Sequence, residues 1–566
     1  MSLNGALNIG ASALTTAQAA MQVTGNNISN LGNANYSREV ADITDLPSTE
    51  IQPGVYMGTG VDLSSIQRQV DESLNSRLNS AMSDYQSANT TQTYSGQIET
   101  IFNALGSQNL QTQMTTFTND WSQLANDPTS TSQRQVVIQD GQSLAQDFNS
   151  LGSQLDSVQT SIGSQLNSLA TNATQLAQQI ATLNQQIATS QGAGGEDNQL
   201  LDQRDATIQQ LAQLVNVQTV NQGNGTVNVY IGSEPLVVGT TSDGLTVQQG
   251  ATSSGQPSYS LAFTSDGGTV QATSGQLGAT LTAQTQLNTV QQQLNSLAGG
   301  LIFGLNSIYS SGQGLNGYTT VTGTNQVQDP TAVLNSSAAG LPFQPVNGSF
   351  VVTTTNTQTG LSSSTLVPVN LTGQPTDTTL NSLTASLNAI PTVQATIQGG
   401  KLTIASTDPN VQISFSQDSS HVLAALGINT FFQGSDANSI AVNSVAASNP
   451  NLLAAAQNGD PGDNTNALAI ANFPSTLQST LGNQSWTDSY NAMIGGIATT
   501  SAQAISDTQS TQDIQQTLQS QQQSVSGVNI DTETVHMLQQ QRSYQGAAMF
   551  ISTVNQMMTA LMQITL

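Results

Sequence analysis

Both ends of the chain lack charged side chains, and this feature most constrains how the protein can fold. The first charged residue of the 566-residue sequence is Arg38, and none follows Arg542. Each end also repeats apolar or small residues at alternating spacings of three and four, which is typical of the contact seam of a coiled-coil helix. Two uncharged amphipathic helices have little polar surface for water, so we expect them to pair with each other.

The two seams supply the residues that we expect to make assembly contacts. The N-terminal seam contains Leu3, Leu7, Gly10, Leu14, Ala17, Met21, Thr24, Ile28 and Leu31. The C-terminal stripe contains Tyr544, Ala547, Ala548, Ile551, Val554, Met558 and Leu561. The predicted contact residues are Leu7, Leu14, Met21, Ile28, Leu31, Tyr544, Ile551, Met558 and Leu561.

Two interpretations of these ends remain open at the level of sequence. Either their outer faces are buried in a larger assembly, or both ends are frayed tails of a free monomer. Glycines in the N-terminal seam lower its helix propensity, and isolated helices are marginal in water. We favour ends that fold by burying their seams against neighbours during assembly.

Asn and Gly are concentrated between Gly25 and Asn35, where the helical pattern ends. Because Asn and Gly tolerate left-handed backbone conformations, we expect Gly32, Asn33 and Asn35 to let the chain leave the helix. A glycine-loop pocket is the alternative, and we favour a simple exit. Arg38, the first charge, is expected to mark where the chain leaves the low-charge inner layer.

The rest of the chain alternates between helical and β-rich patterns. Residues 132–190 keep the three/four apolar spacing throughout and predict one long helix, with further helices at 198–215 and 276–310. Alternating apolar and polar residues around Gly turns predict strands within 216–275 and 330–445. Helix is expected to resume from about residue 464 and to continue to the end.

These patterns predict a multidomain α+β protein in which the N- and C-terminal helices pair as a coiled coil. A long helical-bundle domain comes next, and β-rich outer domains are inserted in the middle. The predicted parts are residues 1–65 with 525–566 as an inner coiled-coil axial domain, 66–215 with 276–318 and 464–524 as a helical rod domain, 216–275 as a β-rich domain, and 319–463 as an outer α+β or β-rich domain.

Charge and hydropathy limit the partners of the chain. Seven basic residues against 33 acidic ones give a net charge of −26. Nucleic-acid phosphates require clustered Lys and Arg, and anionic membrane surfaces attract basic segments, so neither is an expected partner. The N-terminus lacks the positive region of a secretory signal. We expect a soluble chain, or one that is exported without a cleavable signal.

The sequence offers no clear catalytic, metal or cofactor site. The chain has no Cys, and His421 and His536 lack metal-ligand spacing. "DPGDNTN" (460–466) is rich in oxygen ligands but lacks the calcium-loop pattern, so we expect Asp463 to help start a helix. "GAGGED" (192–197) has no strand before it and is expected to be a hinge rather than a phosphate loop. We therefore expect no cofactor and no enzyme activity.

Several segments resemble one family. "NNISNLGNANYSREV" (26–40) resembles the N-terminal signature shared by flagellar rod, hook and hook-associated proteins, although "NANYS" replaces the usual Gly-Tyr-Ser. "SGVNIDTETVHMLQQQRSYQGAAMFISTVNQMMTALM" (526–562) resembles the matching C-terminal region. The internal segments that resemble the first hook-associated proteins are "NQLLDQRD" (198–205), "NSIYSSGQGLNG" (306–317), "LGINTFFQG" (426–434) and "GDNTNALAIA" (462–471).

The resemblance implies a structural subunit of the ring between flagellar hook and filament. Its implied partners are the hook protein, a second junction protein (FlgL-like) and further copies of itself in a helical ring. It also implies secretion by flagellar type III export, with an export chaperone (FlgN-like) at the C-terminal region and no membrane insertion. The alternatives are another axial protein, such as a hook protein or flagellin, and an extracellular adhesin or hydrolase carried on residues 330–445.

Overall fold

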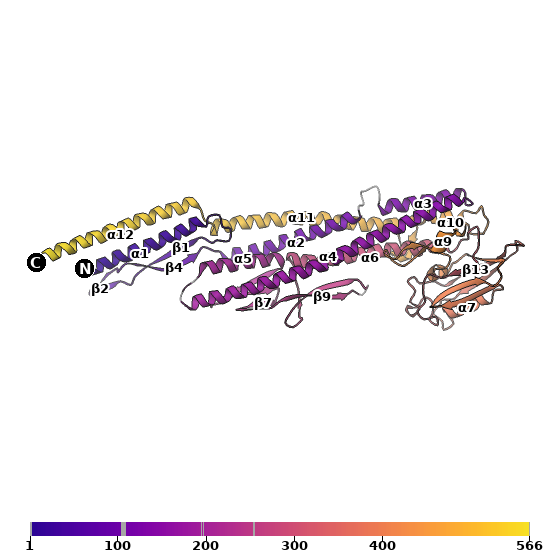
Figure 1. Cartoon of the computed structure of the whole chain (residues 1–566), viewed down its shortest axis with the longest axis horizontal. Coiled ribbons are helices and arrows are strands. Elements are labelled where there is room, and N and C mark those ends of the chain that lie inside the picture. The colour runs from indigo at the N-terminus through magenta and orange to yellow at the C-terminus, as the bar shows by residue number, and fades with distance from the viewer. Residues whose placement is uncertain (1–2, 103–108, 194, 196, 253–254, 565–566) are drawn as a thin grey trace. The chain divides into compact units, whose positions relative to one another are not determined.

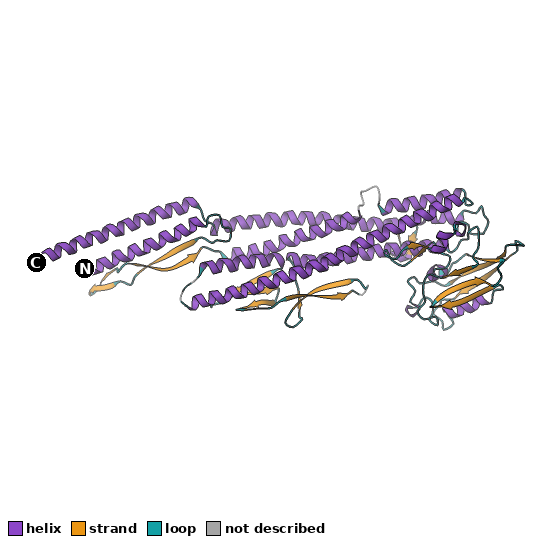
Figure 2. Cartoon of the chain, viewed as in Figure 1, coloured by secondary structure: helices purple, strands orange, loops and turns teal. Residues whose placement is uncertain are grey.

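The computed structural model describes residues 3–102, 109–193, 195, 197–252 and 255–564 (Figures 1 and 2). The chain divides into two compact units, and we describe each by itself. Unit 1 comprises Met1–Thr93, Ile162–Gln284 and Gln503–Leu566, and unit 2 comprises Tyr94–Ser161 and Thr285–Ala502. The helices that contribute residues to both units are α2 (Glu72–Phe102), α4 (Thr131–Gly192), α6 (Gly275–Tyr309) and α11 (Trp486–Ser526).

The two ends of the chain lie side by side in unit 1 (Figure 1). Helix α1 (Leu3–Ser29) packs against α12 (Ile530–Ile564) and also against an antiparallel ladder of β1 (Glu39–Asp45) and β4 (Val61–Arg68). The short strands β2 (Thr49–Gln52) and β3 (Val55–Met57) form a separate two-stranded hairpin. The predicted pairing of the terminal helices is confirmed.

The remainder of unit 1 combines helices with two small antiparallel sheets. Helix α5 (Asn198–Leu214) begins where the Asp197 carboxylate accepts hydrogen bonds from the Gln199 and Leu200 amides, as an N-cap does. One sheet has the order β5 (Val217–Asn221), β6 (Val227–Ile231), β7 (Glu234–Val238) and β8 (Thr241–Ser242). The other has the order β11 (Thr269–Val270), β10 (Pro257–Phe263) and β9 (Leu245–Ala251).

The long apolar stripe on α4 is buried as the sequence predicts. The structure extends this helix from Thr131 to Gly192, within two residues of the predicted bounds 132–190. The stripe residues that are fully buried include Leu144, Phe148, Leu155, Ile162, Leu166, Ala173 and Ile180. Apolar residues that follow the 3.6-residue helical period over so many turns fix which side of the helix is buried. This is why the prediction is confirmed.

Unit 2 contains an aromatic cluster and a β-rich outer core. Helix α3 (Leu110–Asn126) supplies Phe117 and Trp121, which pack edge-on against each other and contact Phe431. One sheet of the outer core has the strand order β14 (Ser362–Val369), β13 (Gly348–Asn356) and β17 (Val411–Ser416). The other has the order β12 (Thr320–Thr322), β16 (Lys401–Ser406) and β15 (Val393–Gln398). Helix α7 (Leu380–Asn388) packs on β14 and β15. We call the buried cluster between Tyr318 and Leu452 the outer core.

Short elements complete unit 2 and correct one prediction. They are η1 (Ser337–Ala339), α8 (Val422–Leu426), β18 (Phe432–Gln433), β19 (Ala441–Val442), α9 (Ser444–Ser448), η2 (Pro450–Leu452), α10 (Thr465–Ala471), η3 (Phe473–Ser475), β20 (Leu477–Gln478), η4 (Ser479–Leu481) and β21 (Gln484–Ser485). Continuous helix from residue 464 was therefore wrong over 472–485 and again over 527–529, between α11 and α12. Pro474 cannot continue a helix, and Gly482 adopts a left-handed φ of 66°.

Candidate assembly site

Small side chains, rather than leucines, make up the most deeply buried stripe of α1. The buried members of this stripe are Ala6, Gly10, Ala17, Ala20, Thr24 and Asn27, and the half-buried Ala13 completes its alternating spacings of four and three. The inward stripe of α12 follows the same spacing with Glu533, Met537, Gln540, Tyr544, Ala547, Ile551, Val554 and Met558. Small residues in one helix let the axes approach closely, since the side chains at a contact set the interaxial distance.

Gly10 lies where α1 and α12 are in close contact. A Cβ atom at this position would lie 2.7 Å from Ile551 Cγ1 and 3.1 Å from Phe550 Cδ1. Real Cβ atoms essentially never come as close as 2.7 Å to another heavy atom, so a larger residue here forces at least the Ile551 side chain to move. The sequence places Gly10 in the seam. In the structure, the Ile551 and Phe550 side chains of α12 occupy the space beside Gly10 that a side chain would need.

The predicted contact residues fall mostly beside the deeply buried stripe of α1 rather than within it. Leu7, Leu14, Met21 and Ile28 recur every seventh residue and are half-buried, one position past Ala6, Ala13, Ala20 and Asn27. Tyr544, Ile551 and Met558 are half-buried on the inward stripe of α12. Leu31 is 44% exposed and Leu561 is 50% exposed. The role of these residues in contacts with other subunits stays a prediction.

A buried ion pair fastens the end of α1 to the start of α12. Arg38 Nε donates to Glu533 Oε1 at 2.6 Å, and the Glu533 side chain is only 2% exposed. Asn27 Nδ2 donates to the other oxygen of Glu533 at 3.0 Å. The side-chain oxygen Oδ1 of Asn27 accepts from the Tyr36 hydroxyl at 2.7 Å and from the Glu39 backbone amide at 2.9 Å. We call Asn27, Tyr36, Arg38, Glu39 and Glu533 the terminal clasp.

The clasp revises the expected role of Arg38. The sequence suggested that the first charge marks where the chain leaves a low-charge layer, whereas the structure pairs it with a carboxylate 495 residues away. The sequence contains Arg38 and Glu533 as charges beside uncharged segments, but nothing in it pairs the two.

A second polar layer connects the clasp region to α5. Arg68 Nη1 donates to Asp202 Oδ1 at 2.7 Å and to Asp205 Oδ2 at 2.9 Å. The Ser37 amide donates to the other Asp202 oxygen at 3.0 Å. Asn198 Nδ2 donates to Glu39 Oε1 at 2.9 Å. Side chains from "NQLLDQRD" thus hold the strands that follow the N-terminal signature.

Burial and charge shift the acid–base behaviour of this layer. Burial, followed by the nearby Glu39 carboxylate, raises the pKa of Tyr36 well above its ordinary value. Burial alone would lower the pKa of Arg68, but the Asp205 and Asp202 carboxylates outweigh it and raise that pKa. Burial raises the pKa of Asp205 although two arginines oppose the shift. The layer therefore keeps both arginine and tyrosine protonated near neutral pH.

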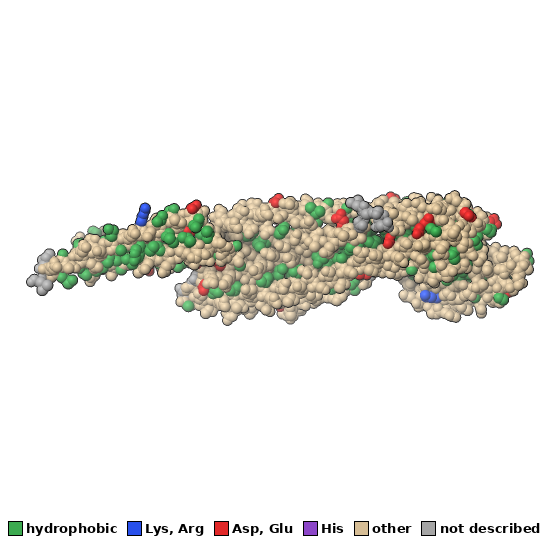
Figure 3. Space-filling view, turned by 45° about the horizontal axis from the view of Figure 1, so that its top comes forward, with side chains coloured by type: hydrophobic (Ala, Val, Ile, Leu, Met, Phe, Trp, Pro, Cys, Tyr) green, Lys and Arg blue, Asp and Glu red, His purple; other side chains and the backbone are tan. Residues whose placement is uncertain are grey.

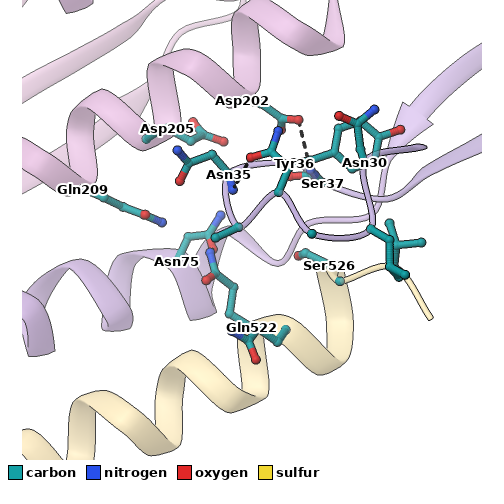
Figure 4. A pocket seen from close by; sticks show the side chains of 18 residues that line it. Asn30, Asn35, Tyr36, Ser37, Asn75, Asp202, Asp205, Gln209, Gln522 and Ser526 are labelled. Atoms are coloured by element: carbon teal, nitrogen blue, oxygen red, sulfur yellow. Dashed lines mark hydrogen bonds between the residues drawn. The ribbon is translucent and has the colours of Figure 1, made fainter. Parts of the chain in front are cut away.

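The Asn-Gly stretch lines a pocket, which corrects two expectations. Residues 30–37 border a cavity of about 340 Å³ together with side chains of α2, α5 and the end of α11, among them Asn75, Asp202, Gln209 and Gln522 (Figure 4). The stretch is therefore both an exit from α1, which ends at Ser29, and part of a pocket. Among the described residues, positive φ occurs at neither Gly32, Asn33 nor Asn35. Hydrogen-bonded turns at Asn30 and Asn33 carry the chain out of the helix instead.

Large apolar side chains remain exposed on α12. The exposed ones are Ile530, Val535, Leu538, Met549, Phe550, Met557, Leu561 and Met562. Apolar side chains gather along the paired ends in the space-filling view (Figure 3). Exposed apolar side chains in this number mark a candidate interaction site, so α12 is the strongest candidate element for contact with other chains.

The remaining candidate residues of the sequence are His421, His536 and Asp463. Within the described ranges, no group of three or more His, Cys, Asp or Glu side chains is arranged to hold a metal ion. His421 precedes α8 with a left-handed φ of 53°, and His536 is half-buried on α12. Asp463 accepts from the Thr465, Gln457 and Asn458 amides ahead of α10, and hydrogen bonds lower its pKa to about 2 against the effect of burial.

Comparison with known proteins places this architecture. Residues 95–325 match the family model of the flagellar hook-associated protein FlgK helical domain. Residues 519–564 match the model of the flagellar basal body rod FlgEFG protein C-terminal region. Flagellar hook-associated protein 1 of Escherichia coli (strain K12) is 27% identical over 575 residues, and that of Salmonella typhimurium (strain LT2) is 25% identical over 579 residues; each match covers 99% of both chains.

A solved structure agrees on the fold. The flagellar hook junction protein FlgK from Burkholderia pseudomallei aligns with a TM-score of 0.50 and 18% identity, covering 80% of this chain and all of that one. Paired termini, a helical domain and inserted sheets define a structural, axial type of flagellar protein. Within that class, the chain is similar to the hook-associated proteins of the FlgK family, both along its whole length and in the matched helical domain.

Proposed function

We propose that this chain is a structural subunit of the ring that joins the flagellar hook to the filament, and that filament assembly requires it. The observation that carries the proposal is the pairing of two uncharged ends that leave large apolar side chains exposed on α12. Such a surface is stable in water only when neighbouring chains cover it. Relatives over the full length of the chain bear the name hook-associated protein 1.

The neighbours that we propose are other axial proteins of the flagellum. The hook protein borders the ring on one side, a second, FlgL-like junction protein borders it on the other, and further copies of this chain complete it. The contact surfaces in this proposal are the half-buried residues Leu7, Leu14, Met21 and Ile28 of α1 and the exposed apolar residues of α12. The terminal clasp presents them together because it fixes the register of the two helices.

We further propose that the chain is secreted by flagellar export without a cleavable signal and with a FlgN-like chaperone on its C-terminal region. The exposed methionines and leucines of α12 are the type of adaptable surface that such a chaperone would cover. Among the described residues, no helix combines the length and apolarity needed to cross a membrane. In this proposal the role is structural rather than catalytic, and the four-part domain division predicted from the sequence remains part of it.

The family comparison favours this function over the alternatives that the sequence left open. A hook protein or a flagellin would share the terminal signatures, but the helical domain matches the FlgK family over residues 95–325. An adhesin or hydrolase carried on residues 330–445 would not require paired, charge-free ends. These considerations favour the junction subunit.

Deletion of the gene in the source bacterium tests the proposal. Cells without this chain should keep intact hooks, lack filaments and release unpolymerised flagellin into the medium. Expression of the intact chain from a plasmid should restore filaments, whereas an empty plasmid should not. Normal filaments on the deletion strain would overturn the proposed function.

A further inference from the structure

Arg542 is the last charged side chain of the sequence, and it lies within α12. It is exposed and shares one face of the helix with Val535, Leu538 and Met549, because residues three, four and seven apart lie on the same side of a helix. These three apolar side chains are 63%, 51% and 74% exposed. In the part of the chain that the structure describes, Arg542 forms no ion pair. It is therefore an unpaired cation within an apolar stripe.

An arginine in water needs no partner, but an arginine beneath a neighbouring chain does. Burial of an unpaired charge is costly, whereas a carboxylate that is buried with it offsets much of that cost. The inference rests on the proposed function in one respect, namely that a neighbouring chain covers the apolar stripe of α12. Under this condition, the neighbour has to bring a carboxylate to Arg542.

The ladder of β1 and β4 carries exposed carboxylates on another side of α1. Gly10 faces α12, whereas the Ser12 hydroxyl accepts from the Val61 amide of the ladder at 3.4 Å. Positions two residues apart are about 200° apart around a helix, so α12 and the ladder pack on different sides of α1 (Figure 1). Asp42 and Asp62 are exposed on the ladder, and neither forms an ion pair within the described ranges. One copy therefore offers a cation on one side and carboxylates on another.

The contacts between α1 and α12 fix the level of Arg542 along α1. Gly10 lies against Ile551, and Asn27 Nδ2 donates to Glu533. Arg542 is nine residues from Glu533 and nine from Ile551. It therefore lies level with the middle of the stretch from Gly10 to Asn27.

Hydrogen bonds between α1 and the ladder fix the level of Asp42 in the same way. The Ser12 hydroxyl accepts from the residue that is paired with Asp45, and the Asn27 side chain bonds to the backbone of Glu39. Asp42 is three residues from Asp45 and three from Glu39. It therefore lies level with the middle of the stretch from Ser12 to Asn27. The cation and this carboxylate are at almost the same level on different sides of α1.

We propose that α12 of one copy packs against the β1–β4 ladder of the next copy and that Arg542 pairs with Asp42 across this contact. Copies that stand side by side around a common axis meet at matching levels, which selects Asp42 among the carboxylates of the ladder. The Ser64 hydroxyl holds one oxygen of Asp42 at 2.9 Å, and the adjacent Ile43 is 41% exposed toward an apolar partner. The contact joins two different surfaces, so it repeats from copy to copy and builds a ring or a shallow helix rather than a closed pair.

Charge reversal in the full chain tests the pair. Arg542→Glu and Asp42→Arg are expressed singly and together in the deletion strain, and filaments per cell are counted by electron microscopy. Each single reversal should lower the number about ten-fold or more, because it places two like charges in one contact. The double reversal should restore most of the filaments, since the pair forms again in the opposite sense.

A carboxylate at another place supplies the matched control for this recovery. Glu50 is exposed on β2, outside the β1–β4 ladder, and Arg542→Glu combined with Glu50→Arg should not recover filaments. Normal filament numbers in either single reversal, or no recovery in the double reversal of Arg542 and Asp42, would overturn the contact.

Disulfide trapping measures the contact directly, because the chain contains no native cysteine. Flagella that carry Arg542→Cys with Asp42→Cys are mildly oxidised and run on a non-reducing gel, where trimers and larger species should appear. Each single variant can give no more than dimers. The matched control is Asp42→Cys with Gln556→Cys, which should give no such species. Gln556 lies on the same exposed face of α12, but about 21 Å along the helix from Arg542.

The outcomes separate this inference from the proposed function. Assembled filaments without the cross-link would mean that another axial protein covers Arg542, which would overturn this contact and leave the junction ring standing. Cross-linking through Gln556 in place of Arg542 would also overturn it, because the levels would not match. Filaments that form without any copy of this chain would instead overturn the proposed function.

Discussion

The outer core of unit 2 and the paired ends of unit 1 are stabilised in different ways. The outer core buries large side chains almost completely, among them Phe350, Ile404, Ile413 and Phe415 at 0–1% exposure. The paired ends bury mainly alanine, glycine and threonine on α1 and leave Met549 of α12 74% exposed. Buried apolar area stabilises a fold roughly in proportion to its size. The outer core therefore buries enough apolar area within its own chain to be stable, whereas the paired ends bury little.

This difference matches what each region has to do. A region that folds independently presents a fixed surface, and a region that folds only with neighbours cannot assemble prematurely. The two units also differ in their ion pairs. Three ion-pair contacts occur in the part of the chain that the structure describes, and all of them fasten unit 1 at Arg38 and Arg68. Of the seven basic residues, only Arg134 and Lys401 fall within unit 2.

The largest expected effect comes from placing a charge on the paired ends. Leu14→Asp or Ile551→Asp should abolish filament assembly, because an isolated carboxylate cannot be buried between apolar helices without a partner. The outer core should stay folded. Filaments are counted by electron microscopy, and tryptophan fluorescence monitors unit 2, since Trp121 and Trp486 both lie there and are fully buried.

An exposed position supplies the matched control for this charge. Leu366→Asp on β14, a residue that is 62% exposed, should leave filaments unchanged. Normal filaments with Leu14→Asp or Ile551→Asp would show that the paired ends are not the assembly surface.

The reverse effect is expected in the outer core. Phe350→Ala removes a fully buried ring and should lower the free energy of unfolding of this region by about 3–5 kcal/mol. Hydrogen exchange of peptides from residues 348–416 should accelerate, while peptides from α1 and α12 should not change. Equal acceleration in both regions would mean that the outer core and the ends unfold as one cooperative body, against the contrast drawn above.

Removal of one charge from the terminal clasp should have a smaller effect, confined to the ends. Glu533→Gln weakens the bond from Arg38 and leaves that guanidinium partly buried, so the paired helices should lose about 1.5–3 kcal/mol. Hydrogen exchange of residues 530–545 reports the change. The double variant Arg38→Gln with Glu533→Gln should recover part of the loss, because no unpaired charge remains. Identical exchange in all variants would show that the clasp does not hold the ends.

Sequence reasoning succeeded where one period persists over many turns. The stripe on α4 and the helices at 198–215 and 276–310 follow directly from their apolar spacing, and the structure has helices at Asn198–Leu214 and Gly275–Tyr309. It failed at residues 472–485, where Pro474 and Gly482 interrupt a segment that otherwise reads as helical. Single Pro and Gly residues end a helix locally, and a prediction based on apolar spacing over a long segment does not detect them.

The assembly site was predicted only in part, for a physical reason. Hydrophobicity favours Leu7 and Met21 as contacts, whereas the buried positions are the small residues one position away, Ala6 and Ala20. The terminal clasp joins Asn27 and Arg38 to Glu533 across the whole chain. No local pattern encodes a partner at that separation. The pocket beside the Asn-Gly stretch likewise exists only because α5 and α11 meet it.

The last expected effect depends on pH and contrasts the acidic side chains of unit 2 with the ion pairs of unit 1. Burial, and then the neighbouring Asp140 carboxyl, raise the pKa of Asp120 from 3.8 to about 7. A carboxyl whose pKa is higher in the folded state binds its proton more tightly there. Its contribution to stability is therefore fully present below pH 3.8 and is lost as pH rises through about 7. Tryptophan fluorescence in urea, followed from pH 4 to pH 8, should show unit 2 losing stability with rising pH through this group.

The variant Asp120→Asn isolates this contribution, because the amide does not titrate. Subtraction of its stability curve from that of the natural chain should leave a difference that falls between pH 4 and pH 7. Asp140→Asn should shift the fall to lower pH, since it removes the neighbouring carboxyl that raises the pKa of Asp120. Asp513→Asn, at an exposed position of α11, should leave the curve of unit 2 unchanged. A flat difference for Asp120→Asn would contradict the proton-linked role of this carboxyl, and unit 2 would then differ from unit 1 in packing alone.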